Sequence, residues 1–139
     1  MIFLGLDLGS KTLGLAISDK TGIIATSLDV IRYRDYEELF NELDLVVYNR
    51  KVDAFVLGNP LNLDGSASDR SIVSLEFKDL LIKRYKKEVY MQDERLSTVE
   101  AQKILLSNDE SRKKRKRVVD KIAACIILQA FLDKRSHER

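Results

Sequence analysis

The stretch Phe3-Leu4-Gly5-Leu6-Asp7-Leu8-Gly9-Ser10 is a short apolar run that contains one carboxylate near its end. Because side chains alternate between the two sides of a strand, the leucines point to one side and Asp7 to the other. A carboxylate is costly to bury unless it is paired, hydrogen-bonded or bound to a metal. Asp7 therefore indicates either a hydrogen-bonded turn with Gly9 and Ser10 or a metal or phosphate site at a strand end.

Composition limits the kinds of site that this chain can build. Its 139 residues, 45% of them hydrophobic, fit one domain spanning residues 1–139. The single cysteine, Cys125, excludes an internal disulfide and is expected to be a buried structural thiol. With His137 as the only histidine, classical zinc sites and Ser-His-Asp catalysis lack ligands. Any metal would be held by carboxylates, which suits Mg²⁺ or Mn²⁺.

The N-terminus has no signal-peptide pattern, and no run approaches the roughly 18–20 apolar residues of a membrane span. We therefore expect a cytoplasmic protein without membrane contact. The net charge of +2 hides a strong asymmetry, because residues 112–117 are all basic. Without those six, 18 basic residues remain against 22 acidic ones. This concentration of positive charge indicates a local contact with a polyanion.

Periodicity along the chain predicts an α/β fold. Turn signals separate three strands expected at 2–8, 13–19 and 23–31, which would form an antiparallel meander. Helical spacing follows from the cap residue Asp35 to Val47, and later helices are expected at 69–86, 97–107 and 116–134. Apolar runs at 53–58 and 88–92 predict parallel strands. The order implies a mixed sheet, three antiparallel strands and then parallel ones, with helices on both faces.

Two details of this prediction concern packing. Val73, Phe77, Leu80 and Leu81 are expected on the inner side of the helix at 69–86. Gly5, Gly14 and Ala16 should line the same side of the sheet as Asp7. These small residues either let a helix pack closely or leave room for a phosphate backbone beside Asp7.

Acidic residues from three separate segments need an explanation. Asp7 ends the first strand, the pair Asp93-Glu94 ends the last one, and Asp120 lies in a largely apolar helix. Residues three, four and seven positions after Asp120 are apolar, so Asp120 should face the sheet. Alone, it could simply complement the helix dipole. Three converging carboxylates would repel one another unless cations lie between them, as in two-metal sites for phosphoryl transfer.

The chain also resembles the YqgF/RuvX family, Holliday-junction-resolvase-like members of the ribonuclease H superfamily. The resemblance covers nearly the whole chain and rests on four ordered motifs: residues 5–16, 58–65, 93–101 and 111–129. It implies a five-stranded ribonuclease H-like fold and acidic site positions at Asp7, within Asp93-Glu94 and at Asp120, where we favour Glu94 over Asp93. One departure is Asn59, where relatives often have leucine.

This resemblance implies a metal-dependent nuclease, with Asp7, Glu94 and Asp120 as catalytic metal ligands for Mg²⁺ or Mn²⁺. Processing of the 5′ end of pre-16S rRNA in ribosome biogenesis is ascribed to the family, and branched, Holliday-junction-type DNA is an alternative substrate. The oligomeric state is not predicted.

Basic residues near these acids are candidates for nucleic-acid binding. Lys11 and Arg95 flank the acidic positions and could hold the scissile phosphate, although Arg95 could equally pair with a carboxylate. The basic block, expected just before the last helix, is either a solvated surface or a contact with the phosphate backbone; it comprises Arg112, Lys113, Lys114, Arg115, Lys116 and Arg117.

Two other functions compete with the nuclease. A nucleic-acid-binding assembly or transcription factor that does not cleave would use the basic block and give the acids a structural role. An actin-like ATP-binding domain would use the Asp7–Gly14 segment as a phosphate loop. The length argues against the latter, because such proteins need two domains around the nucleotide.

Overall fold

The computed structural model describes residues 1–94 and 112–137, of which residues 112–120 are described by their backbone alone. Its centre is a six-stranded mixed sheet with strand order β3-β2-β1-β5-β6, and β4 also pairs with β2. The strands are β1 (Phe3–Leu8), β2 (Thr12–Ser18), β3 (Ala25–Ser27), β4 (Ile31–Arg32), β5 (Ala54–Asn59) and β6 (Val89–Asp93). The described helices are α1 (Tyr36–Asn49), α2 (Asp69–Tyr85) and α4 (Arg112–His137).

Strand β1 is central and carries Asp7 into the middle of the sheet. It pairs antiparallel with β2, with Asp7 opposite Gly14, and parallel with β5. Strand β5 in turn pairs parallel with β6. The predicted antiparallel start and parallel continuation are thus confirmed, and the C-terminal ends of β1, β5 and β6 lie at one edge.

The sheet has six strands rather than five, because the strand expected at 23–31 is two short ones. Ser27 lies opposite Ala16, and Ile31 lies opposite Leu13. Between these two pairs, the segment from Ser27 to Ile31 advances by four residues, whereas β2 advances by three. The extra residue interrupts the ladder as a β-bulge does. The strand also starts later than predicted: the backbone N–H groups of Ile23 and Ile24 donate to the Asp19 carboxylate instead of to a neighbouring strand.

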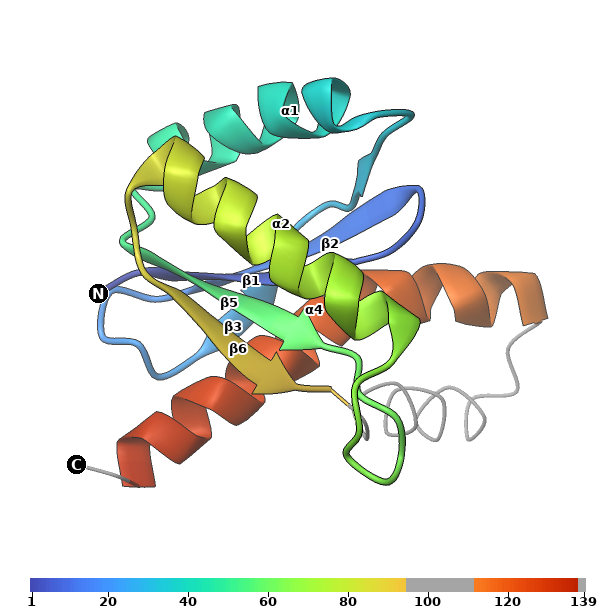
Figure 1. Cartoon of the computed structure of the whole chain (residues 1–139). Coiled ribbons are helices and arrows are strands. Elements are labelled where there is room, and N and C mark those ends of the chain that lie inside the picture. The colour runs from blue at the N-terminus through green and yellow to red at the C-terminus, as the bar shows by residue number, and fades with distance from the viewer. Residues whose placement is uncertain (95–111, 138–139) are drawn as a thin grey trace.

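Helices cover both faces of the sheet, as predicted (Figure 1). One core lies between the sheet and α1 with α2, and it contains Leu4, Leu6, Leu8, Leu39 and Phe77. The other lies beneath α4 and contains Phe3, Ala124, Ile127 and Leu128. The alternation of β1 therefore places its leucines toward α1 and α2, and the odd-numbered residues on the α4 side.

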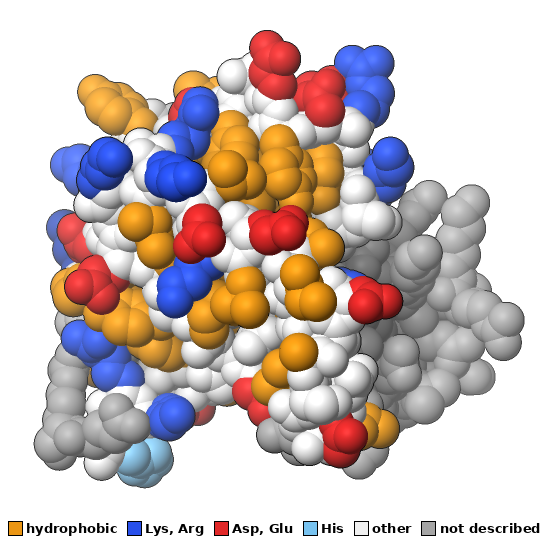
Figure 2. All heavy atoms as spheres, in the orientation of Figure 1, with side chains coloured by type: hydrophobic (Ala, Val, Ile, Leu, Met, Phe, Trp, Pro, Cys, Tyr) orange, Lys and Arg blue, Asp and Glu red, His pale blue; other side chains and the backbone are white. Residues whose placement is uncertain are grey.

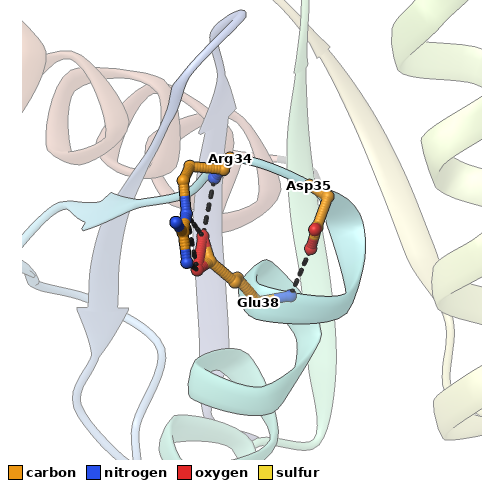
Figure 3. Close-up of polar contacts among 3 residues, drawn as sticks. All are labelled: Arg34, Asp35 and Glu38. Atoms are coloured by element: carbon orange, nitrogen blue, oxygen red, sulfur yellow. Dashed lines mark hydrogen bonds and ion pairs between the residues drawn. The ribbon is translucent and has the colours of Figure 1, made fainter.

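Local signals explain where α1 and α2 begin. Asp35 caps α1 by accepting a 2.9 Å hydrogen bond from the Glu38 backbone N–H, as predicted, while Glu38 pairs with Arg34 (Figure 3). In α2, Ser68 and Ser71 form a reciprocal capping box.

The inner side of α2 was only half predicted. Phe77 and Leu81 are buried, but Val73 and Leu80 are exposed, and the serines at 71 and 74 are buried instead. The small serines let α2 lie close to the sheet. Figure 2 shows a group of adjacent hydrophobic side chains on the face formed by α1 and α2, with charged side chains around it.

Close packing of α4 explains Gly5. A Cβ atom there would lie 2.7 Å from the Leu128 Cβ and 3.1 Å from the Ala124 carbonyl oxygen. Gly5 thus serves helix packing, and the alternative of clearance for a phosphate is wrong at this position. Gly14 is buried opposite Asp7. Cys125 is only half-buried; its Sγ donates weakly to the Ala25 carbonyl oxygen at 3.5 Å.

Helix α4 begins at Arg112, so the basic block lies within the helix rather than before it. Lysine and arginine are good helix formers, which accounts for the earlier start. The helix expected at 97–107 and the residue Arg95 lie outside the described residues. Across the part of the chain that is described, no helix is both long and apolar enough to cross a membrane.

Candidate active site

Two of the predicted acidic residues meet at the C-terminal edge of the parallel strands. Asp7 is the second-to-last residue of β1, and Glu94 follows β6 directly. The intervening strand β5 fixes Glu94, because Asn59 pairs with Asp93 and its carbonyl oxygen accepts a 3.2 Å hydrogen bond from the Glu94 backbone N–H. Residues separated by 87 positions in the sequence are therefore neighbours in the fold.

The environment of Glu94 disfavours its charged form. Burial, followed by the charge of Asp7 and a side-chain hydrogen bond with Asp7, raises the pKa of Glu94 from 4.5 to about 8. Arg70 opposes this shift, and Asp93 adds to it. Asp93 itself is exposed, whereas Glu94 is largely covered. The two adjacent acids thus differ in their surroundings, and Glu94 is the one coupled to Asp7.

The space around the Glu94 carboxylate depends on Gly58. A Cβ atom at that position would lie 2.1 Å from the Glu94 Oε2 and 2.8 Å from the Ile127 Cδ1. Glycine therefore lets the carboxylate lie against β5. Within the described residues, Glu94 Oε2 is buried and has no hydrogen-bond partner. Buried oxygen atoms normally have partners, so this atom needs one.

A hard divalent cation fits the carboxylate oxygen atoms of Asp7 and Glu94. Mg²⁺ and Mn²⁺ prefer oxygen ligands, and a cation would offset the repulsion between Asp7 and Glu94. Among the described side chains, those of residues 1–94 and 121–137, there is no cluster of three or more acidic, histidine or cysteine residues suited to a metal. The described site is thus a pair of carboxylates, and a third ligand would come from the side chains that are not described.

Asp120 is the predicted third ligand. Its backbone lies in α4, and Ala123, Ala124 and Ile127, which follow it by three, four and seven residues, are buried against the sheet as predicted. The side chain of Asp120 lies outside the description, as do those of residues 112–117. Their roles as ligand and as nucleic-acid contacts stay predictions.

Two polar residues near the acidic pair were missed by sequence reasoning. Arg70 lies in the first turn of α2, donates to the Leu8 carbonyl oxygen at 3.1 Å and lowers the pKa of Glu94. Asn59 ends β5 beside Glu94. The turn-rich loop after β5 was the available signal, because ligands in open α/β sheets bind beyond the carboxyl ends of strands.

The structure places Lys11 in a neighbouring cavity, which it lines together with Arg70. Among the tyrosines, Tyr33 is buried and Tyr48 is 83% exposed on α1.

Comparisons with known proteins agree with this architecture. The family model RuvX, described as Holliday junction resolvase, matches residues 1–134. A Clostridium tetani protein named "Putative pre-16S rRNA nuclease" is 44% identical over 133 residues, covering 96% of each chain. A relative from Streptococcus suis with the same name is 45% identical over 137 residues, covering 96% of this chain and 99% of its own.

Solved structures share the fold at low sequence identity. Thermus thermophilus RuvC in complex with a Holliday junction superposes with a TM-score of 0.56 at 14% identity, covering 97% of this chain and 96% of its own. The fowlpox virus Holliday junction resolvase superposes with a TM-score of 0.53 at 13% identity, covering 96% of this chain and 99% of its own. The ribonuclease H-like fold is thereby confirmed, and the matches in sequence show that the chain belongs to the RuvX (Holliday junction resolvase) family.

Proposed function

We propose that this protein is a divalent-metal-dependent nuclease that hydrolyses phosphodiester bonds in structured nucleic acid. The observation that carries the proposal is the half-buried pair Asp7 and Glu94, in which Glu94 has an unpartnered oxygen and a pKa raised to about 8. Bringing two mutually repelling, partly desolvated carboxylates together costs free energy that a bound cation would offset. Perturbed acids of this kind are typical of functional sites.

The relatives favour RNA as the substrate. Those that are 44–45% identical carry a name that refers to pre-16S rRNA, and we infer processing of its 5′ end in ribosome biogenesis. Branched DNA is the second candidate, because the family description and the RuvC complex both refer to Holliday junctions.

Asp7 and Glu94 would hold the metal together with Asp120. Two Mg²⁺ or Mn²⁺ ions would activate a water molecule and stabilise the leaving oxygen. Glu94 must lose its proton to act as a ligand, and metal binding would then be favoured at higher pH. Arg70 assists, since its charge lowers the pKa of Glu94 and so favours the carboxylate.

A cleavage assay tests this function. A pre-16S transcript with its 5′ leader and a four-way DNA junction are incubated with Mn²⁺ and either wild type or Asp7→Asn. We expect metal-dependent cleavage by the wild type and a loss of at least about a hundredfold in the variant, as when one transition-state-stabilising group is removed. Equal cleavage by both proteins would exclude the catalytic assignment, and binding without turnover would favour the non-cleaving factor.

A further inference from the structure

A basic cavity lies beside the acidic pair, and of its lining residues only Arg70 takes part in the chemistry proposed above. It has a volume of about 660 Å³. Its charged lining residues are Lys11 from the β1–β2 turn, Arg32 from β4 and Arg70 from α2. The residues Ser10, Thr12 and Ser74 complete the polar lining, which includes no carboxylate among the described residues.

The cavity lies at the C-terminal end of β1. Leu8 lines it and belongs to the core facing α1 and α2, while Val73 and Ser74 reach it from α2. Because side chains alternate along β1, Asp7 points to the α4 side. The cavity and the acidic pair therefore lie next to each other at the C-terminal end of β1, and the cavity extends toward α2.

The walls of the cavity are fixed by hydrogen bonds. Gly9 N–H donates to the Thr12 carbonyl oxygen at 2.7 Å and closes the β1–β2 turn. Tyr33 makes two hydrogen bonds to this turn. Its backbone N–H donates to the Lys11 carbonyl oxygen at 3.0 Å, and its hydroxyl group donates to the Gly9 carbonyl oxygen. A Cβ at Gly9 would lie 3.0 Å from the Thr12 Oγ1, so the turn is tightly packed at this position.

The cations are brought together by the same framework. Arg32 lies directly opposite Thr12 in the β2–β4 ladder. Arg70 donates to the Leu8 carbonyl oxygen at 3.1 Å, next in sequence to Asp7. Three cations from separate elements in a preformed cavity without acids match an anion, and arginine suits the geometry of phosphate in particular. Preorganisation lowers the entropic cost of binding such a group.

We propose that this cavity binds a phosphate of the substrate strand other than the scissile one, as the strand crosses the sheet edge toward Asp7 and Glu94. This inference rests on the proposed function, because it takes a phosphodiester backbone as the ligand. Arg70 lies between the two sites and contacts the end of β1 from the cavity side. The cavity would thus fix the position of the strand relative to the acidic pair.

Metal-free binding measurements test this proposal separately from catalysis. A fluorescein-labelled RNA stem–loop and a labelled four-way DNA junction are titrated in EDTA at several salt concentrations. The variants are Arg32→Gln and Lys11→Gln, both of exposed side chains. Arg50→Gln is the matched control, because Arg50 is exposed and precedes the N-terminal end of β5, at the opposite edge of the sheet.

Each cavity variant should weaken binding on every sequence and reduce the slope of log K against log salt by about 0.7–0.9, the value for one lost phosphate contact. Arg50→Gln should match the wild type. Neutral methylphosphonate linkages placed one at a time along the probe should show one position whose neutralisation weakens the wild type but not Arg32→Gln.

The proposal would be overturned if both cavity variants kept the wild-type slope of log K against log salt. It would also be overturned if no methylphosphonate position weakened the wild type without weakening Arg32→Gln. If cleavage by the wild type still requires Asp7, the proposed function stands without this cavity. Failure of the wild type to bind either probe would overturn the cavity and the substrate class together.

Discussion

Replacing Glu94 with glutamine should stabilise the metal-free protein at alkaline pH. The pKa of Glu94 is raised to about 8, so the folded protein keeps this proton at pH values where the unfolded chain, with a pKa near 4.5, has lost it. Between about pH 4.5 and 8 the folded state binds more protons than the unfolded state, and stability must fall as pH rises. Glutamine has almost the same shape and cannot ionise.

The expected magnitude follows from this difference in pKa. For a group that titrates alone, a change from 4.5 to about 8 corresponds to roughly 5 kcal/mol. Asp7 shares the titration, so we expect Glu94→Gln to gain about 2–5 kcal/mol over the wild type above pH 8. The gain should shrink toward zero near pH 4.5, where Glu94 is protonated in both states.

Urea denaturation in EDTA from pH 5 to 9 measures this difference. Glu88→Gln provides the matched control, because Glu88 is exposed and precedes β6, at the opposite end of the strand from Glu94. The control should follow the wild type at every pH. A difference between Glu94→Gln and wild type that does not change with pH, or a destabilised Glu94→Gln at pH 8, would refute the account of the acidic pair.

Three further outcomes are expected. Mg²⁺ or Mn²⁺ at about a hundred times its Kd should stabilise the wild type by about 2.7 kcal/mol, near 10 °C in Tm, with a Kd that falls as pH rises; a shift that survives in Asp7→Asn would place the ion elsewhere. Gly58→Ala should keep the fold but lose most of that metal-induced shift in calorimetry. The new Cβ would lie only 2.1 Å from the present position of Glu94 Oε2, so the carboxylate would have to move. Gly5→Ala should cost about 1–3 kcal/mol in urea denaturation by overpacking Leu128, and Leu128→Ala in the same chain should recover part of the loss; additive effects would contradict the contact.

Much of the fold could be predicted because its signals are local. Asp35 caps α1, the apolar runs became β5 and β6, and the register of β1 with β2 follows from two alternating stretches joined by a short turn. The errors arose where tertiary contacts decide. The bulge near residues 28–30 depends on pairing with β2, and the choice of serines over Val73 and Leu80 in α2 depends on the sheet beneath.

The candidate site was predicted in outline for the same reason. Carboxylates at strand ends are visible in the sequence, whereas the contact between Asp7 and Glu94 requires the strand order β1-β5-β6. Arg70 and Asn59 carry no periodic signal, and only the position of the loop after β5 points to them. The sequence left open whether Gly5 serves helix packing or leaves room for a phosphate backbone. Only the close contact with α4 in the structure decides for helix packing.

Mn²⁺ binding measured by calorimetry shows whether Asp7 and Glu94 belong to one metal site. Wild type, Asp7→Asn, Glu94→Gln and the double variant are compared at pH 8. Each single variant should lose most of the affinity, and the double variant should lose little more, because one site is already disrupted. Wild-type affinity in either single variant would contradict the account.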